Sequence, residues 1–245
     1  MCEHCGCGRP EHVHEHDHGH SHTHDYAAGS GRTEIQVNAS VMEANDRFAH
    51  QNRVLFQRAG VYAVNIMSSP GAGKTTVVEA LARRFGDSMA VIVGDVQTTR
   101  DAERVIRAGS RAHQIQTAGA CHLDAHSVAH ALEHLDLAGC KLLVIENVGN
   151  LVCPAGYDLG EHDKIAILSL PEGDDKVLKY PALFHRINML LINKTDLAPH
   201  VEFDVDKAVN ECRSLNRAFQ WFAVSAKTGQ GMDAFFAALA VRAGL

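Results

Sequence analysis

From residue 61 to the C-terminus, short runs of apolar residues alternate with longer stretches whose apolar side chains recur at helical spacing. The short runs predict strands at 61–67, 89–93, 112–116, 141–145, 164–169, 188–192 and 221–224. The longer stretches predict helices at 74–85, 101–108, 124–134, 204–215 and 232–241. Alternation of this kind is typical of an α/β fold with a mostly parallel sheet flanked by helices on both faces.

The first 60 residues show a different pattern. Ser40 and Glu43 fit a capping box, apolar side chains follow at approximately helical spacing, and Gly60 ends the run, which predicts one N-terminal helix. Ahead of it there is almost nothing apolar to bury, and eight of the 17 histidines lie between His4 and His24. We therefore expect a disordered Cys/His-rich metal-binding tail and linker at 1–32 and a folded domain with an N-terminal helix at 33–245.

The composition narrows the class of protein. Hydrophobic residues make up 46% of the 245 residues, enough for a sizeable core, and no run approaches the roughly 18 consecutive apolar residues of a membrane span. The formal charge of -6 gives no sign of a nucleic-acid partner. The N-terminus lacks the basic and apolar regions of a secretory signal, so we expect a cytoplasmic protein. In that compartment seven cysteines indicate thiolate chemistry or metal binding more than disulfides.

Residues 68–75 read Ser-Ser-Pro-Gly-Ala-Gly-Lys-Thr and lie between a predicted strand and a predicted helix. That context is typical of a Walker A loop, whose backbone N–H groups wrap phosphates without obstruction by side chains. Lys74 would reach the β- and γ-phosphates, and the Thr75 hydroxyl would bind Mg²⁺. Ser68 stands where the pattern usually has its first glycine. The expected phosphate contacts come from Gly71, Ala72, Gly73, Lys74, Thr75 and Thr76.

Two further motifs, at 193–196 and 225–227, each follow a predicted strand. The Asp196 carboxylate would accept hydrogen bonds from N1–H and the 2-amino group of guanine, which adenine does not offer. Lys194 and Lys227 would lie along the base, and the Ala226 N–H would donate to guanine O6. The predicted base contacts come from Asn193, Lys194, Asp196, Ser225, Ala226 and Lys227. The sequence therefore predicts a GTPase that binds GTP and GDP and releases phosphate.

The segment between these motifs supplies candidates for catalysis. Glu146 follows a buried run at the position of a Walker B carboxylate and would lie near Mg²⁺, and the Gly149 N–H would meet the γ-phosphate. Asp95, after the run 89–93, is the first candidate to hold a magnesium ligand or the attacking water. Asp101 is the second, or simply a charge at a helix N-terminus. No glutamine follows Gly149 to orient water, so we expect slow hydrolysis, which suits a switch.

Two groups of side chains predict metal binding. Cys2, Cys5 and Cys7 form CxxCxC, in which three thiolates can fold around one Ni²⁺ or Zn²⁺ ion. The histidines that alternate with other residues from 12 to 24 would store several such ions weakly, or would only add solubility. Cys121, His122 and Cys153 form the second group, where GTP hydrolysis would alter metal coordination if the three converge, within one chain or across a two-fold axis. The alternative is a Cys-His pair with a structural role.

The whole chain resembles the HypB family of hydrogenase nickel-incorporation GTPases. The resemblance depends on the segments MCEHCGCG, SSPGAGKTT, VGDVQTTRDAERV, TAGACHLDA, ENVGNLVCPAGYDLGE, PEGDDKVLKYP, NKTDL and SAKTGQG. It implies a P-loop NTPase of the nucleotide-dimerised GTPase class, which forms a GTP-dependent homodimer. It also implies nickel insertion into the nickel-iron hydrogenase large-subunit precursor, directly or indirectly, with a small nickel metallochaperone as partner. It favours nickel at the CxxCxC site and metal at Cys121, His122 and Cys153.

Other functions stay open beside this one. The protein could be a nickel or zinc reservoir with residual GTPase activity, or a related GTPase chaperone that serves urease or a cobalamin enzyme. The CxxCGC start and the run NVGNLVCP disfavour the urease and cobalamin alternatives. In the dimer, Lys176 or Lys179 would approach the partner's nucleotide, or be only a solvated lysine.

Overall fold

Seven parallel strands form one sheet in the computed structural model, which describes residues 30–95, 100–117 and 119–245. The strands are β1 (Tyr62–Ser68), β2 (Met89–Asp95), β3 (Arg111–Gln116), β4 (Leu142–Glu146), β5 (Asp163–Ser169), β6 (Met189–Asn193) and β7 (Gln220–Ala223). Their order across the sheet is β3-β2-β4-β1-β5-β6-β7, and every neighbouring pair is parallel. All seven predicted strands are present within a residue or two of their expected ends, which confirms the predicted α/β fold.

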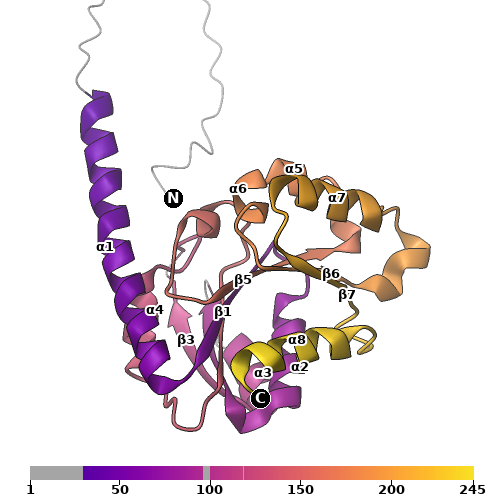
Figure 1. The fold of residues 1–245 in the computed structure, drawn as a ribbon, viewed down its shortest axis with the longest axis horizontal. Helices are drawn as coiled ribbons and strands as arrows, with labels where there is room; N and C mark the ends of the chain where they lie inside the picture. The colour runs from indigo at the N-terminus through magenta and orange to yellow at the C-terminus, as the bar shows by residue number, and fades with distance from the viewer. Residues whose placement is uncertain (1–29, 96–99, 118) are drawn as a thin grey trace, which may run out of the picture. The chain divides into compact units, whose positions relative to one another are not determined.

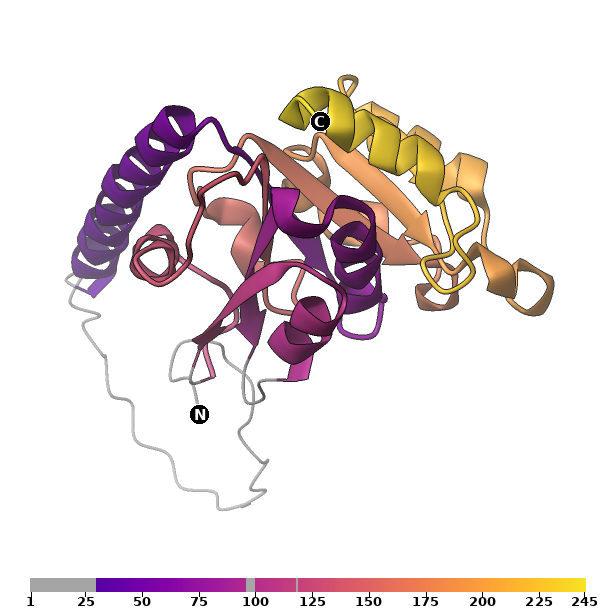
Figure 2. The ribbon, with the colours of Figure 1, turned by 90° about the horizontal axis from the view of Figure 1, so that it is seen from below.

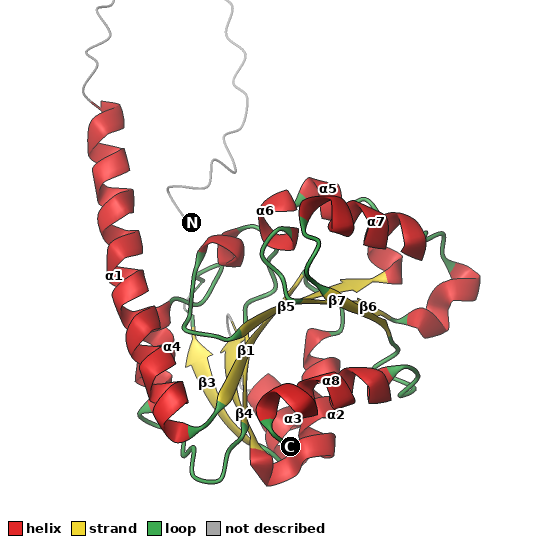
Figure 3. Cartoon of the chain, in the orientation of Figure 1, coloured by secondary structure: helices red, strands yellow, loops and turns green. Residues whose placement is uncertain are grey.

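Helices cover both faces of the sheet (Figure 3). On one face lie α2 (Lys74–Phe85), α3 (Arg100–Arg107) and α8 (Met232–Ala243), which Figure 2 shows in front of the sheet. On the other lie α4 (Ala125–Leu132), α5 (Lys176–Lys179), α6 (Pro181–Phe184) and α7 (Val205–Leu215) (Figure 1). Short 3₁₀ turns are η1 (Gly86–Ser88), η2 (Cys153–Gly156), η3 (Leu170–Glu172) and η4 (Thr195–His200).

The two faces explain why the central strands are continuously apolar. Along β4, Leu142 and Val144 pack under α2 and α3, whereas Leu143 and Ile145 pack under α4. Successive side chains of a strand point to opposite faces, so a strand covered on both sides is hydrophobic at nearly every position. The short helices α5 and α6 escape prediction from the sequence because each has only four residues, too few to show a helical period.

The first helix is longer than the capping box predicts. α1 spans Ser30–Ala59 and begins ten residues before Ser40, which lies inside the helix and does not start it. The chain between residues 30 and 40 contains no proline to stop a helix, so the turn at Ser40 continues an existing one. Residues from Asn38 to Leu245 form one compact unit. In the described part of the chain no helix combines the length and apolarity needed to cross a membrane.

The strand arrangement places the predicted motifs at one edge of the sheet. The loops after β1, β4 and β6 carry the residues 68–75, 146–149 and 193–196. Because all strands are parallel, their carboxyl ends meet at the same edge, where ligands bind in open α/β sheets.

Candidate functional site

The loop between β1 and α2 has the backbone shape of a phosphate-binding loop. Gly71 and Gly73 have φ values of 79° and 94°, a left-handed region that residues with a Cβ rarely enter. Ser68, in contrast, is the last residue of β1, and among the described residues Lys194 is the one non-glycine residue with positive φ. Serine is therefore tolerated at the first position of the motif because that position does not need glycine's freedom.

Glu146 is the centre of a small polar cluster at the start of α2. Its Oε1 accepts hydrogen bonds from Lys74 Nζ at 2.9 Å and from Thr75 Oγ1 at 2.8 Å. The Thr75 hydroxyl also lies 3.1 Å from Asp101 Oδ2, and Arg104 holds Asp101 from the next turn of α3. The structure thus brings together the predicted Lys74, Thr75 and Glu146, and adds Asp101.

The donor set of this cluster fits Mg²⁺. Glu146 Oε2 is buried without a hydrogen-bond partner, next to a threonine hydroxyl and a second carboxylate, and Mg²⁺ prefers such oxygen ligands. Asp101, the second candidate from the sequence, is the acid that the structure places at Thr75. Asp95 ends β2, but its side chain lies outside the described residues, so its role stays a prediction.

A pocket of about 320 Å³ lies where the guanine base is expected, beside the phosphate loop. It is lined by Gly73, Thr76, Asn193, Lys194, Asp196, Leu197, Ser225, Ala226 and Lys227. Ser225 Oγ donates to Asp196 Oδ1 at 2.6 Å, and the Ala226 N–H donates to Asn193 Oδ1 at 3.1 Å. The predicted base contacts therefore surround one hollow, with the Asp196 carboxylate held in place by the loop after β7.

Asn193 and Lys194 join the base loop to the phosphate loop. Asn193 Nδ2 donates to the Ala72 carbonyl at 2.9 Å, and Lys194 Nζ donates to the Gly71 carbonyl at 2.6 Å. A Cβ on Gly73 would come within 2.6 Å of Asn193 Nδ2, so this position has no room for a side chain. These two hydrogen bonds tie the loop after β6 to the loop after β1.

The structure also brings Cys121, His122 and Cys153 together within one chain. Their ligand atoms all lie within 4.8 Å of one another, and Cys121 Sγ lies 3.4 Å from His122 Nδ1. All three side chains are partly buried. Burial lowers the pKa of His122 and outweighs the nearby Asp124 carboxylate, which acts to raise it. Burial therefore favours the neutral imidazole, the form that binds a metal. No two-fold axis is needed to assemble the cluster.

A buried amide connects this cluster to the nucleotide site. Asn147, next to Glu146, accepts hydrogen bonds through Oδ1 from the Val148 N–H at 2.9 Å and from the Leu123 N–H at 3.1 Å. Leu123 directly follows His122. Asn147 Nδ2 donates to Asn65 of β1. The loop after β4 is thus tied to the segment that carries Cys121 and His122.

Gly149 completes this connection on the side of the phosphates. A Cβ on Gly149 would lie 3.2–3.3 Å from three atoms of Pro70, so the loop after β4 packs directly against the phosphate loop. Cys153 lies four residues further along the same loop, in η2. Movement of Gly149 would therefore reach Cys153 through a short stretch of backbone.

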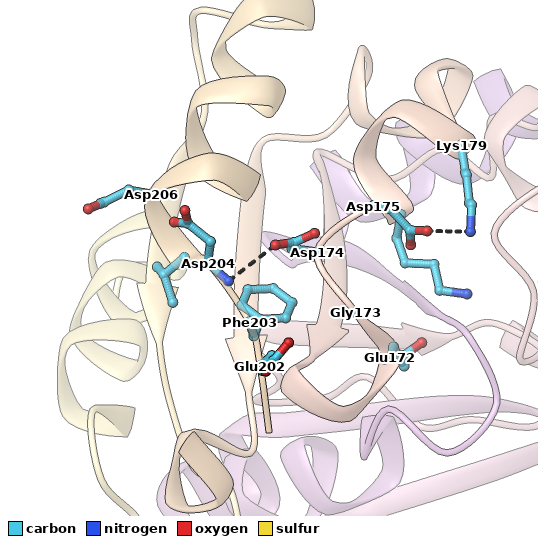
Figure 4. Close-up of a pocket in the computed structure, with 11 residues that line it drawn as sticks. Glu172, Gly173, Asp174, Asp175, Lys179, Glu202, Phe203, Asp204 and Asp206 are labelled. Carbon is cyan, nitrogen blue, oxygen red and sulfur yellow. Dashed lines mark hydrogen bonds and ion pairs between the residues drawn. The ribbon is translucent and has the colours of Figure 1, made fainter. Parts of the chain in front are cut away.

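A second, larger hollow of about 770 Å³ lies between the end of η3 and the start of α7 (Figure 4). Its lining is mainly acidic, and Lys179 forms an ion pair with Asp175, as Figure 4 shows. Lys176 lies over the ring of Tyr180 at 5.9 Å. Both lysines thus have partners within the chain, and an approach to a second subunit's nucleotide stays a prediction.

The remaining cysteines divide into two groups. Cys140 and Cys212 are buried, and burial raises the pKa of Cys212 to about 12, so its thiol is unreactive at neutral pH. Cys2, Cys5, Cys7 and the alternating histidines lie outside the described residues.

Sequence reasoning missed Asn147 as a functional residue. Its position between Glu146 and Gly149 was a usable signal, because a polar side chain there must find partners inside the domain. The sequence could not show that Leu123 would be one of those partners, since the two residues are 24 positions apart. Tyr157, whose ring lies 3.9 Å from the ring of His122, was missed for the same reason.

Comparison with known proteins finds relatives that all belong to one family. Residues 62–223 match the family described as the CobW/HypB/UreG nucleotide-binding domain. The hydrogenase maturation factor HypB of Rhizobium leguminosarum bv. viciae is 47% identical over 211 residues, which cover 85% of this chain and 71% of that protein. HypB of Escherichia coli K12 is 45% identical over 206 residues, which cover 83% of this chain and 71% of that protein.

Solved structures agree with these relatives. The crystal structure of HypB from Helicobacter pylori in complex with nickel has a TM-score of 0.79 and 40% sequence identity, over 82% of this chain and 95% of that one. HypB from Archaeoglobus fulgidus has a TM-score of 0.76 and 38% identity, over 82% and 99% of the two chains.

Proposed function

Because the chain belongs to the HypB family of hydrogenase maturation factors, we propose that it hydrolyses GTP and that its nucleotide state controls a nickel site in the same domain. The nickel would be cargo for the large-subunit precursor of a nickel-iron hydrogenase. The observation that carries the proposal is the hydrogen bond from the Leu123 N–H to Asn147, which joins the two sites.

The nucleotide half rests on the cluster around Glu146. Lys74 would neutralise charge on the β- and γ-phosphates, and Thr75, Glu146 and Asp101 would hold Mg²⁺. When bound, Mg²⁺ supplies charge stabilisation for the phosphate oxygens as the bond to the leaving group breaks. Asp196 would select guanine over adenine. Asn150 follows Gly149 where a water-orienting glutamine could stand, which supports slow hydrolysis and a switch.

The metal half rests on Cys121, His122 and Cys153. Two thiolates and a neutral imidazole suit Ni²⁺ or Zn²⁺, and three protein ligands leave a position for an incoming or leaving group. The nickel complex of the Helicobacter pylori protein supports nickel here.

The coupling would run through the loop after β4. A γ-phosphate would attract the Gly149 N–H, which packs on Pro70, and the loop would follow. Asn147 would then pull on Leu123, and η2 would shift Cys153. The ligand atoms of the cysteine cluster, which lie within 4.8 Å of one another, would move apart or closer together. The affinity for metal would therefore differ between the GTP-bound and the GDP-bound protein.

The wider cycle follows from the family. We propose a GTP-dependent homodimer in the cytoplasm, a small nickel metallochaperone as partner, and a tail at 1–32 that supplies metal to the GTPase domain at 33–245. Delivery to the hydrogenase precursor would be direct or through that metallochaperone.

The test uses the reactivity of single cysteines in the full chain. Nickel-loaded protein is alkylated with either GDP or a non-hydrolysable GTP analogue and Mg²⁺, and mass spectrometry follows Cys121 and Cys153. We expect nickel to protect both thiols and the two nucleotide states to differ in protection by about fivefold or more, the usual scale of coupling between sites. Equal protection in both states would contradict the coupling. Phosphate release, abolished in Lys74→Ala, tests hydrolysis separately.

Two controls make the result specific. Cys140 and Cys212 report on unfolding, because both thiols are buried and should stay unmodified in the native protein. Asn147→Ala should keep GTP binding and nickel protection but remove the difference between nucleotides. It should also cost about 1–3 kcal/mol of stability, since the Leu123 N–H loses its acceptor.

A further inference from the structure

A second group of metal-ligating side chains lies at the C-terminal end of α4, on the solvent side. His130, Glu133 and His134 are all exposed, and their ligand atoms lie within 4.8 Å of one another. The rings of His130 and His134 are 5.0 Å apart between centroids. None of these residues belongs to the Cys121, His122 and Cys153 cluster.

The end of α4 explains how the group forms. His130 lies in the last turn of α4, and Glu133 and His134 follow in a tighter turn, in which their N–H groups donate to the His130 and Ala131 carbonyls. The continued turn keeps the three ligand atoms together. The opposite side of α4 is apolar, with Val128, Ala131 and Leu132 buried against the sheet. The histidines are therefore not needed for packing, because the helix is anchored without them.

The surroundings favour a cation. Among the described residues Glu133 has no ion pair, so its carboxylate is free to act as a ligand. A further imidazole, His113 of β3, stacks on His134 with ring centroids 5.4 Å apart and an angle of 19° between the rings. His113 is partly buried and belongs to the sheet itself, so a third imidazole lies on the sheet side of the group.

We infer that His130, Glu133 and His134 form a binding site for a divalent transition-metal ion, separate from the cysteine cluster, with the His113 ring stacked beside it. Two imidazoles four residues apart at a helix end, with a carboxylate between them in the sequence, suit Zn²⁺, Ni²⁺ or Cu²⁺ better than Mg²⁺ or Ca²⁺. Exposure and open coordination positions make this a site that takes up and releases metal readily. It does not depend on the proposed coupling to GTP.

The experiment uses Zn²⁺ as the probe and the full chain, because residue-resolved detection separates this site from the N-terminal histidines. Histidines are modified with diethyl pyrocarbonate at a series of increasing Zn²⁺ concentrations. The series ends where the reactivity of the N-terminal histidines no longer decreases. Mass spectrometry then gives the rate at each position. We expect His130 and His134 to become protected together, whereas His50, exposed on α1, stays reactive.

Variants show whether the protection comes from a shared ion. His130→Ala or Glu133→Gln should weaken zinc protection of His134 by about tenfold or more, since even loss of an outer-shell partner costs about 10–100-fold in affinity. His126→Ala removes a histidine one turn earlier, in contact with Phe48, and should leave the protection intact. All three positions are exposed, so the fold should survive, and circular dichroism checks this.

Two results would overturn the site. One is that His130 and His134 stay as reactive as His50 at the highest zinc concentration. The other is that His134 remains fully protected in both His130→Ala and Glu133→Gln, because independent protection means that no ion bridges the residues.

Discussion

Glu146 is a charged residue with a fully buried side chain, which is unfavourable unless partners compensate for the lost water. Lys74 and Thr75 both donate to one of its oxygens, and the other oxygen is buried without a partner. The chain alone therefore leaves one buried oxygen of this carboxylate without a hydrogen bond. A bound magnesium ion would provide the missing partner for that oxygen. This would explain why a carboxylate lies at a position where its desolvation is unfavourable.

Asp196 is the residue on which guanine specificity depends in our proposal. Asp196→Asn should weaken GTP binding by about 10–100-fold, because a charge-assisted pair of hydrogen bonds worth about 1.5–3 kcal/mol is replaced by a mismatched donor. The same variant should gain affinity for xanthosine triphosphate, whose base offers an acceptor in place of the 2-amino group. Titration with fluorescent nucleotides measures both.

The control for this substitution is Asp206→Asn, an exposed acid on α7 that lines no part of the guanine pocket. It should bind both nucleotides like the parent protein. Unchanged GTP affinity in Asp196→Asn would show that the base binds elsewhere.

At the scale of elements, the attachment of α1 is polar as well as hydrophobic. Asn52 Nδ2 donates to the carbonyls of Ala125 and Leu159, and Phe56 is fully buried beneath the helix. Arg53 donates twice to Asp158, at 2.8 Å to each oxygen. The helix is thereby fixed to the first residue of α4, shortly after His122, and to the segment after η2, shortly after Cys153.

The Arg53 pair predicts a pH dependence of stability. Burial alone would raise the pKa of Asp158, but the hydrogen bonds from Arg53 and from the Gly160 N–H outweigh it and hold the pKa below its ordinary value. The stabilisation is therefore present above the unfolded pKa of about 3.9 and is lost as the pH falls through the lower folded pKa. As the pH falls through this range, the Asp158→Asn variant should lose less stability than the parent protein, because it has no carboxylate to protonate at this position.

Urea unfolding between pH 6 and pH 3 measures the effect. Near pH 6 the variant should be less stable by up to about 1 kcal/mol, since the pair is partly exposed, and the difference should vanish in acid. Asp46→Asn, an exposed acid on α1 without an ion pair among the described residues, serves as the control. A parallel pH profile for parent and Asp158→Asn would contradict the assigned cause.

At the scale of the whole molecule, two exposed apolar side chains are suited to a contact with a partner. Val152, beside Cys153 in the segment after β4, is 62% exposed, and Leu178 in α5 is 55% exposed. Val152 follows the proposed switch residue Gly149, so a contact at Val152 would form in one nucleotide state only. The cysteine cluster would then lie near the contact, where closing of a dimer could limit its access to solvent.

A dimer that depends on GTP is the corresponding prediction. Sedimentation of the full chain with GDP should give monomers, and a non-hydrolysable GTP analogue with Mg²⁺ should give dimers at the same concentration. Lys74→Ala, which removes the phosphate contact, should stay monomeric in both. A monomer at all analogue concentrations would contradict the switch.

The local features of this chain were predictable because they depend on neighbouring residues. The strands β4, β5 and β6 follow from apolar runs, since a strand buried on both faces is mostly hydrophobic along its length, whereas the edge strands β3 and β7 are more polar and only partly buried. The loop at 68–75 was recognisable because glycine with positive φ and a following lysine are needed at fixed spacing. The start of α1 was wrong because a capping box also occurs inside longer helices.

The sequence by itself thus determined the fold class and the loop at 68–75, and it predicted the guanine contacts, all of which follow from short-range patterns. Only the tertiary structure decided that Cys153 joins Cys121 and His122 within one chain, that Asn147 binds Leu123, and that Asp101 lies at Thr75. These contacts join residues 24 to 32 positions apart. Their geometry depends on which strands become neighbours in the sheet, and a local pattern does not encode that choice.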